Sequence, residues 1–184
     1  MTQAVENLNT DSQTLGDVKS MIPDFAKDIK LNLSNIINDE TLSTQQLWGT
    51  ILASALATGN QTLIGAAKTD TQAQLTPEAY TATQSAAAIM AMNNVYYRFV
   101  HLSSNKDYQT MPAKLRMNVM ANPGVERGDF ELWSLAVSAI NGCGMCIDAH
   151  ETELRKHGIT STQIQTAVRV ASTLHAVAAV LTGE

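Results

Sequence analysis

The chain has 184 residues, which suits one domain or two small ones, and 45% of them are hydrophobic while 16% are charged, which excludes intrinsic disorder. Seventeen acidic residues against 12 basic ones give a net charge of −5 at pH 7, which excludes a protein that works mainly by binding nucleic-acid phosphates. We find no apolar run near the ~20 residues of a membrane helix and no apolar signal core near the start. The default expectation is a cytoplasmic protein without a membrane or nucleic-acid partner.

Apolar residues recur with helical spacing along most of the chain, and no alternating pattern bounded by hairpin turns is present. The sequence therefore predicts an all-α fold. A first helix is expected over 24–38, with an apolar stripe that begins at Phe25. Ser43 and Gln46 form a capping-box pattern that opens a second helix, and Gly59 is placed to end it.

The middle of the chain contains one strong helix start. Thr76 can serve as the N-cap and Pro77 as the first residue of a long Ala- and Met-rich helix that reaches about Val100. The polar stretch 101–109 predicts a loop, and a short helix is expected over 112–120.

Three further helices are expected toward the C-terminus. Asp129 is predicted to cap a helix over 130–141, which Gly142 ends. The next helix covers 143–157, and a capping-box pattern opens a last one over 160–181.

The two cysteines form one C-x-x-C pair, Cys143 and Cys146, and His150 follows four residues later. On a helix these three side chains share one face. Because Gly142 breaks the preceding helix, the thiols lie at a helix start, where free backbone N–H groups favour a thiolate and lower the pKa of a thiol. Cα atoms three residues apart on a helix are about 5 Å from each other, which permits a disulfide. The pair predicts thiol–disulfide chemistry.

Other interpretations of the pair compete with this one. The cysteines could form half of a zinc site with Glu131 as a further ligand, although structural zinc usually has two ligand pairs. Covalent haem attachment is excluded because Ile147, and not His, follows the second cysteine. A thioredoxin-like fold would need strands, and none are predicted. Two cysteines packed as small hydrophobic residues are disfavoured by the flanking Gly142 and Gly144.

The remaining candidates carry weaker signals. Glu131 can act as a base or orient His150, yet a Glu in a first helical turn is also electrostatically favoured. We assign no role to the other histidines, which fit a loop, a helix C-terminus and a core or interface position: His101, His157 and His175. The Met and Ala stripe over 86–92 and the two tryptophans are expected to serve packing.

Glu131, Cys143, Cys146 and His150, spaced E-x11-C-x-x-C-x3-H, resemble the site of the alkylhydroperoxidase D (AhpD) family in the carboxymuconolactone decarboxylase-like superfamily. The resemblance covers nearly the whole chain and includes the segments PDFAKDIKLNLS, QLWGTILASALATGN and FELWSLAVSAINGC. It implies an all-helical subunit of a homotrimer, and an antioxidant enzyme with peroxidase and disulfide-reductase activity. Because the decarboxylase branch generally lacks the cysteine pair, the resemblance favours redox chemistry.

The resemblance also implies roles for single residues. Cys146 would reduce the hydroperoxide and become a sulfenic acid, and Cys143 would resolve it to a disulfide, while Glu131 and His150 form a proton relay. No bound cofactor or metal is implied. Some members have His between the cysteines where this chain has Met145, which predicts a shorter relay or a lower activity.

The implied partners are other redox proteins. They are the peroxiredoxin AhpC, which would be reduced, and a lipoylated acyltransferase with its NADH-dependent dihydrolipoamide dehydrogenase, whose dihydrolipoamide would supply electrons. The alternative function is a redox-regulated disulfide carrier or binding protein with little peroxidase activity, and a third is a structural zinc protein.

A faint internal repeat accompanies these motifs. Residues 46–48 and 131–133 share the order polar residue, Leu, Trp, and each opens an Ala- and Ser-rich helix. We therefore expect one helical domain over 1–184 made of two similar halves, a degenerate one at about 43–105 and a redox-active one at about 128–184. Two Ala-rich helical segments can also align by chance.

Overall fold

The computed structural model describes residues 13–183, and this part of the chain contains helices and no strand. The predicted all-α fold is confirmed. In chain order the elements are α1 (Leu15–Met21), the 3-10 helix η1 (Asp24–Ala26), α2 (Lys27–Ile37), α3 (Thr44–Thr58), α4 (Gln61–Thr71), α5 (Pro77–Leu102), α6 (Asp107–Thr110), α7 (Asn118–Ala121), α8 (Arg127–Ile140), α9 (Gly144–Lys156) and α10 (Ser161–Thr182).

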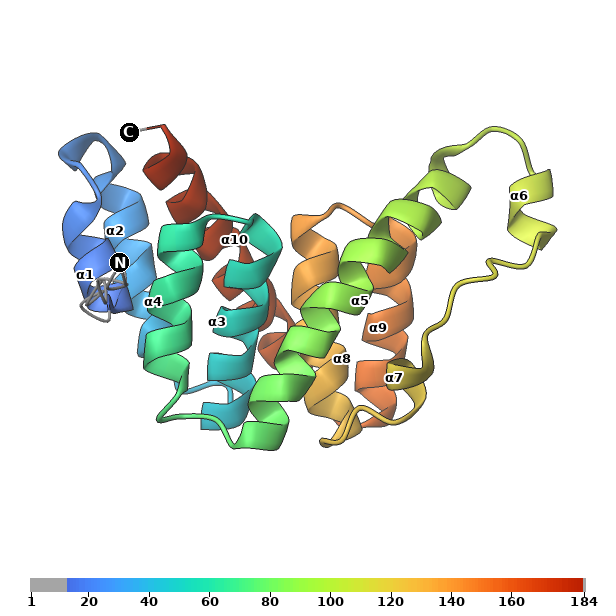
Figure 1. The fold of residues 1–184 in the computed structure, drawn as a ribbon, viewed down its shortest axis with the longest axis horizontal. Helices are drawn as coiled ribbons and strands as arrows, with labels where there is room; N and C mark the ends of the chain where they lie inside the picture. The colour runs from blue at the N-terminus through green and yellow to red at the C-terminus, as the bar shows by residue number, and fades with distance from the viewer. Residues whose placement is uncertain (1–12, 184) are drawn as a thin grey trace, which may run out of the picture.

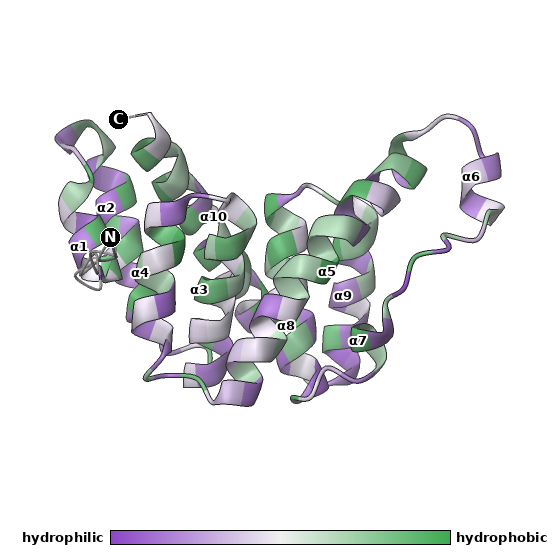
Figure 2. Cartoon of the chain, viewed as in Figure 1, coloured by the Kyte–Doolittle hydropathy of each residue, from purple (hydrophilic) through white to green (hydrophobic). Residues whose placement is uncertain are grey.

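Helices α3, α5, α8 and α10 form the centre of the molecule, with α9 packed on α8 and α5 (Figure 1). Helix α4 covers α3, while α1 lies against α4 and α2 against α10. Figure 2 shows apolar residues gathered on these central helices, whereas α6 is mainly hydrophilic. Trp133 and Phe130 of α8 are fully buried, and burying such a side chain stabilises the fold by roughly 1.5–3 kcal/mol.

Helix α10 corrects one expectation about hydropathy. By length and composition α10 could cross a membrane, because its most apolar stretch of 18 residues has a mean hydropathy of 1.4. However, 44% of that stretch is buried inside the molecule, and the helix packs against α2, α3 and α8. Length and apolar composition alone therefore do not distinguish a membrane-spanning helix from a core helix.

Helix boundaries that depend on caps are confirmed. The Ser43 hydroxyl accepts a hydrogen bond from the Gln46 backbone N–H, and the Gln46 side chain accepts one from the Ser43 N–H. Thr160 and Gln163 form the same capping box at the start of α10. Gly59 ends α3 with a φ of 74°, a left-handed conformation that glycine adopts at little cost.

The predicted role of Asp129 as a helix cap is wrong. Helix α8 begins at Arg127, with Glu126 at the cap position, so Asp129 lies inside the first turn. Its carboxylate accepts hydrogen bonds from the side-chain amides of Gln45 at 2.7 Å and Gln46 at 2.9 Å. Asp129 therefore ties α8 to α3, a tertiary role that its position in the sequence does not reveal.

The segment between α5 and α8 also differs from expectation. Helix α5 continues to Leu102, and the short α6 replaces part of the predicted loop. Of the helix predicted over 112–120, only α7 forms, because Lys114 takes a φ of 53° that interrupts a right-handed helix. Residues 103–126 include no buried residue, and in Figure 1 they form an arm that extends from the end of α5.

The first predicted helix is divided into η1 and α2. Its apolar stripe is confirmed at Leu33 and Ile36, which are buried. Phe25 is an exception, because it precedes α2 in η1 and is 80% exposed.

Two runs of three helices, α3 to α5 and α8 to α10, follow each other in the order expected of two similar halves. That they are copies of one repeat stays a prediction.

Candidate active site

The turn between α8 and α9 brings the two cysteines together. Gly142 has a φ of 65° and redirects the chain after α8, and the Cys143 N–H donates to the Ser138 carbonyl oxygen at 3.1 Å. Cys143 occupies the cap position of α9 and Cys146 lies in its first turn. Their Cα atoms are 5.3 Å apart and their sulfurs form a disulfide. Both sulfurs thus lie where free N–H groups of a helix start can stabilise negative charge.

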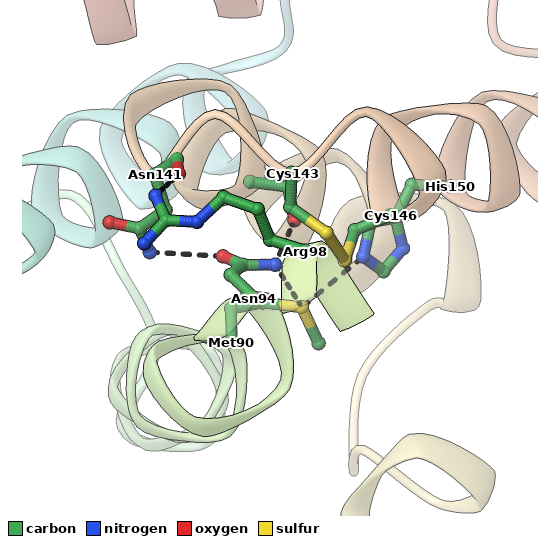
Figure 3. The surroundings of a disulfide bond; sticks show 8 residues. Met90, Asn94, Arg98, Asn141, Cys143, Cys146 and His150 are labelled. Atoms are coloured by element: carbon green, nitrogen blue, oxygen red, sulfur yellow. Dashed lines mark hydrogen bonds between the residues drawn. A yellow bond between two sulfur atoms is a disulfide. The ribbon is translucent and has the colours of Figure 1, made fainter. Parts of the chain in front are cut away.

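Helix α5 holds this turn in place through a chain of hydrogen bonds (Figure 3). The Asn94 amide nitrogen donates to the Ser138 hydroxyl at 2.9 Å, and Asn141 donates to the Asn94 amide oxygen at 2.9 Å. The Arg98 guanidinium donates to the Asn141 carbonyl oxygen at 2.6 Å. These bonds fix the C-terminal end of α8, and with it the position of the cysteine turn.

Glu131 and His150, which the sequence could only suggest as partners, are in direct contact. The His150 Nδ1 lies 2.6 Å from the Glu131 Oε2, and the Arg127 Nη2 lies 2.7 Å from the other carboxylate oxygen. Glu131 is 2% exposed, so these two partners compensate for the burial of its charge. When Nδ1–H donates to the carboxylate, the neutral imidazole keeps Nε2 as the nitrogen that can take up a proton.

Met90 is a site residue that the sequence did not indicate. Its sulfur lies 3.2 Å from the His150 Nε2, and Figure 3 shows it reaching from α5 toward the imidazole. Met90 belongs to the stripe expected to serve packing alone, and it is also 1% exposed. Arg127 was missed as well, although its spacing of four residues from Glu131 is a signal for a helical ion pair.

A pocket of about 360 Å³ lies beside Cys146 and His150, which both line it. Cys143 is fully buried and is not among the lining residues. Of the two sulfurs, Cys146 is therefore the one that a molecule in the pocket meets. Most of the lining is weakly polar or apolar: Met90, Tyr97, Met117, Met120, Met145 and Ala149.

The other histidines lie apart from this pocket. His101 is in the last turn of α5, and the predicted loop position is wrong because the helix extends further. His157 follows α9 as predicted and lies 3.4 Å from Glu153. His175 is exposed on α10, so it is not a core residue. Within residues 13–183, no group of three or more His, Cys, Asp or Glu side chains is placed to hold a metal ion.

The fold and the site together define a helical protein with a cysteine pair capable of redox chemistry, beside a buried carboxylate–imidazole pair. The model of the carboxymuconolactone decarboxylase family matches residues 106–183. An alkyl hydroperoxide reductase AhpD of Maricaulis maris is 61% identical over 91% of this chain and 96% of its own length. Proteins of the same name from Rhodopseudomonas palustris and Hyphomonas neptunium are 61% and 57% identical, over 90% and 93% of this chain and 91% and 95% of their own lengths. The chain belongs to the AhpD family, as the resemblance predicted.

Proposed function

We propose that this chain is an alkyl hydroperoxide reductase in which Cys146 attacks the peroxide and Cys143 resolves the product. The observation that carries this assignment is the placement of the pocket, which meets Cys146 and His150 but not the fully buried Cys143. The names of the relatives, at about 60% identity over most of the chain, support the substrate class.

The first step is the reduction of the hydroperoxide. The Cys146 thiol gives its proton to His150 Nε2, and the thiolate attacks the terminal peroxide oxygen. A sulfur–oxygen bond forms, the oxygen–oxygen bond breaks, and the departing alkoxide takes the proton from His150 and leaves as an alcohol. Cys146 is oxidised to a sulfenic acid.

The second step closes the disulfide. The Cys143 sulfur attacks the Cys146 sulfur, the sulfur–oxygen bond breaks, and the departing hydroxide takes the proton of the Cys143 thiol and leaves as water. The two Cα atoms are already at disulfide distance, so this step needs little movement of the backbone. Glu131 would hold the imidazole in the orientation and tautomer that the proton transfer requires.

Two electrons and two protons must then return to the pair. We propose dihydrolipoamide on a lipoylated acyltransferase as their source, with dihydrolipoamide dehydrogenase regenerating it. The reduced pair would pass its electrons either to a hydroperoxide or to AhpC, through a mixed disulfide at Cys146. The proposed setting is an antioxidant homotrimer in the cytoplasm. These partners rest on the family resemblance.

The direct test is a stopped-flow assay with tert-butyl hydroperoxide and excess dihydrolipoamide in the presence of a metal chelator. We expect turnover by the wild type and none by Cys143→Ser or Cys146→Ser. The Thr152→Ala variant, on the exposed side of α9, serves as the matched control and should turn over normally. Full turnover by either cysteine variant would contradict the two-cysteine mechanism. A wild type that forms its disulfide but does not turn over would instead favour a redox-regulated carrier.

A further inference from the structure

One polar side chain in the pocket has no function in the mechanism above. Asn93 of α5 lines the same pocket as Cys146 and His150 and is 5% exposed. Its amide oxygen is buried and has no hydrogen-bond partner in the described part of the chain. A buried amide oxygen without a partner costs free energy, so a function is the expected reason for its presence.

The next residue in α5, Asn94, is an asparagine with a structural role. The Asn94 amide nitrogen bonds Ser138 and its amide oxygen bonds Asn141, so both ends of the group are used. Asn93 lines a pocket that otherwise offers mainly methionine, tyrosine and alanine surfaces. The amide oxygen of Asn93, unlike that of Asn94, is therefore left without a partner beside the pocket.

We propose that Asn93 is a substrate-binding residue whose side-chain amide hydrogen-bonds the –OOH group of an organic hydroperoxide. This inference rests on the proposed function and deepens it. When the amide rotates toward the bound molecule, its oxygen accepts the peroxide O–H, and its NH2 can donate to the second peroxide oxygen, which becomes the alkoxide when the oxygen–oxygen bond breaks. The alkyl group lies against the methionine side chains, whose flexible thioethers adapt to apolar groups of different shape.

The test separates the two half-reactions in Asn93→Leu, which keeps a similar volume but cannot form hydrogen bonds. We expect the second-order rate of oxidation of the reduced protein by cumene hydroperoxide to fall about 10-fold or more. The rate at which dihydrolipoamide reduces the disulfide should stay within about 2-fold, because that reaction involves no peroxide. The melting temperature should not fall, since an unpartnered amide is removed.

Asn93→Ala repeats the test if leucine does not fit, and Asn35→Leu, on the exposed surface of α2, is the matched control. An unchanged peroxide rate in the Asn93 variants would overturn the proposal and leave the proposed function intact. Equal losses in both half-reactions with a lower melting temperature would also overturn it, because they indicate a structural role. If the reduced wild type does not react with cumene hydroperoxide, both the proposed function and this inference fail.

Discussion

At the scale of single residues, the feature that most affects the chemistry is the burial of a carboxylate against an imidazole. Glu131 contacts His150 through one oxygen and Arg127 through the other. Arg127 also donates to the Met120 carbonyl oxygen, which connects this group to the arm that borders the pocket. The orientation of His150 thus depends on Glu131, and through Glu131 on Arg127. Neither of these two residues is among those that line the pocket.

We predict that Glu131→Gln lowers the rate of peroxide reduction at least about 10-fold, because the amide neither fixes the tautomer of His150 nor stabilises its protonated form. The disulfide should still form, since the cysteine turn is held by Asn94 and Ser138. Stopped-flow measurement of the reduced protein with tert-butyl hydroperoxide, over a range of pH, checks the prediction.

The matched control is Glu151→Gln, on the exposed part of α9 and 3.8 Å from Arg155. It removes a carboxylate from α9, next to His150 in the sequence but exposed, and should leave both the rate and its pH profile unchanged. A Glu131→Gln protein with the pH profile and rate of the wild type would show that the carboxylate has no part in proton transfer.

Helical spacing in the sequence indicated the part of this site that lies on α9, and the family resemblance added Glu131 of α8. Cys143, Cys146 and His150 are related by helical spacing, and the structure places them on one turn and one helix face. Met90 and Asn93 reach the site from α5 through tertiary packing. Spacing along the chain carries no information about such contacts.

At the scale of helices, α3 packs closely against α8 at Gly49. A Cβ atom added at Gly49 would lie 2.3 Å from the indole of Trp133, which is fully buried. We predict that Gly49→Ala lowers the free energy of unfolding by about 1–3 kcal/mol, because neither helix can move away without disturbing the core. Urea denaturation of the reduced protein measures this change.

Gly65→Ala provides the control for that substitution. Gly65 is inside α4, and an added Cβ there would meet nothing within 4 Å. Its replacement should raise stability by about 0.5–1 kcal/mol, because alanine loses less entropy than glycine in a helix. Equal stability changes at the two glycines would contradict the close packing of α3 on Trp133.

Helix α1 was not predicted from the sequence, and its start depends on a charged cap. Hydrogen bonds from the Thr14 side chain and backbone lower the pKa of Asp17 below its ordinary value of 3.8. These hydrogen bonds stabilise the folded protein at pH values above 3.8, the ordinary pKa. Their contribution is lost as the pH falls through the lower pKa of the folded state.

We therefore predict that Asp17→Ala lowers the melting temperature at pH 7, and that the difference from the wild type shrinks toward pH 3. Thermal unfolding at a series of pH values checks this. A difference that grows as the pH falls would contradict the assigned direction of the pKa shift.

Helices whose starts carry cap signals could be predicted with nearly correct ends, as Ser43, Thr76 and Thr160 show. Besides the missed α1 and the division of the first predicted helix, errors lie at Asp129 and in the arm of residues 103–126. Asp129 has a cap-like residue type but finds partners on another helix. The arm contains no buried residue, so no apolar periodicity marks its short helices.

At the scale of the whole molecule, apolar side chains on the end of α5 and on the arm are left half or more exposed by residues 13–183. Phe99 is 50% exposed, Leu102 73% and Met111 55%. Exposed apolar groups of this kind mark protein interfaces. They support the proposed homotrimer, which the sequence indicated only through family resemblance.

We predict that the wild type sediments at three times the mass of one chain, and that Phe99→Glu combined with Leu102→Glu reduces it to a single chain. Placing two charges in a buried apolar contact costs more free energy than such a contact supplies. Analytical ultracentrifugation gives the masses. A wild type that sediments as one chain would remove the support for a trimer.

The central claim is that Cys146 is the sulfur that reacts with the hydroperoxide, and it is tested most directly by trapping its oxidised form. The Cys143→Ser protein is reduced, treated with one equivalent of tert-butyl hydroperoxide in the presence of dimedone, and analysed by peptide mass spectrometry. We predict that the dimedone adduct is found on Cys146 in high yield, with Cys146→Ser giving none on Cys143. An adduct on Cys143 in the Cys146→Ser protein, with none on Cys146 in the Cys143→Ser protein, would contradict the account.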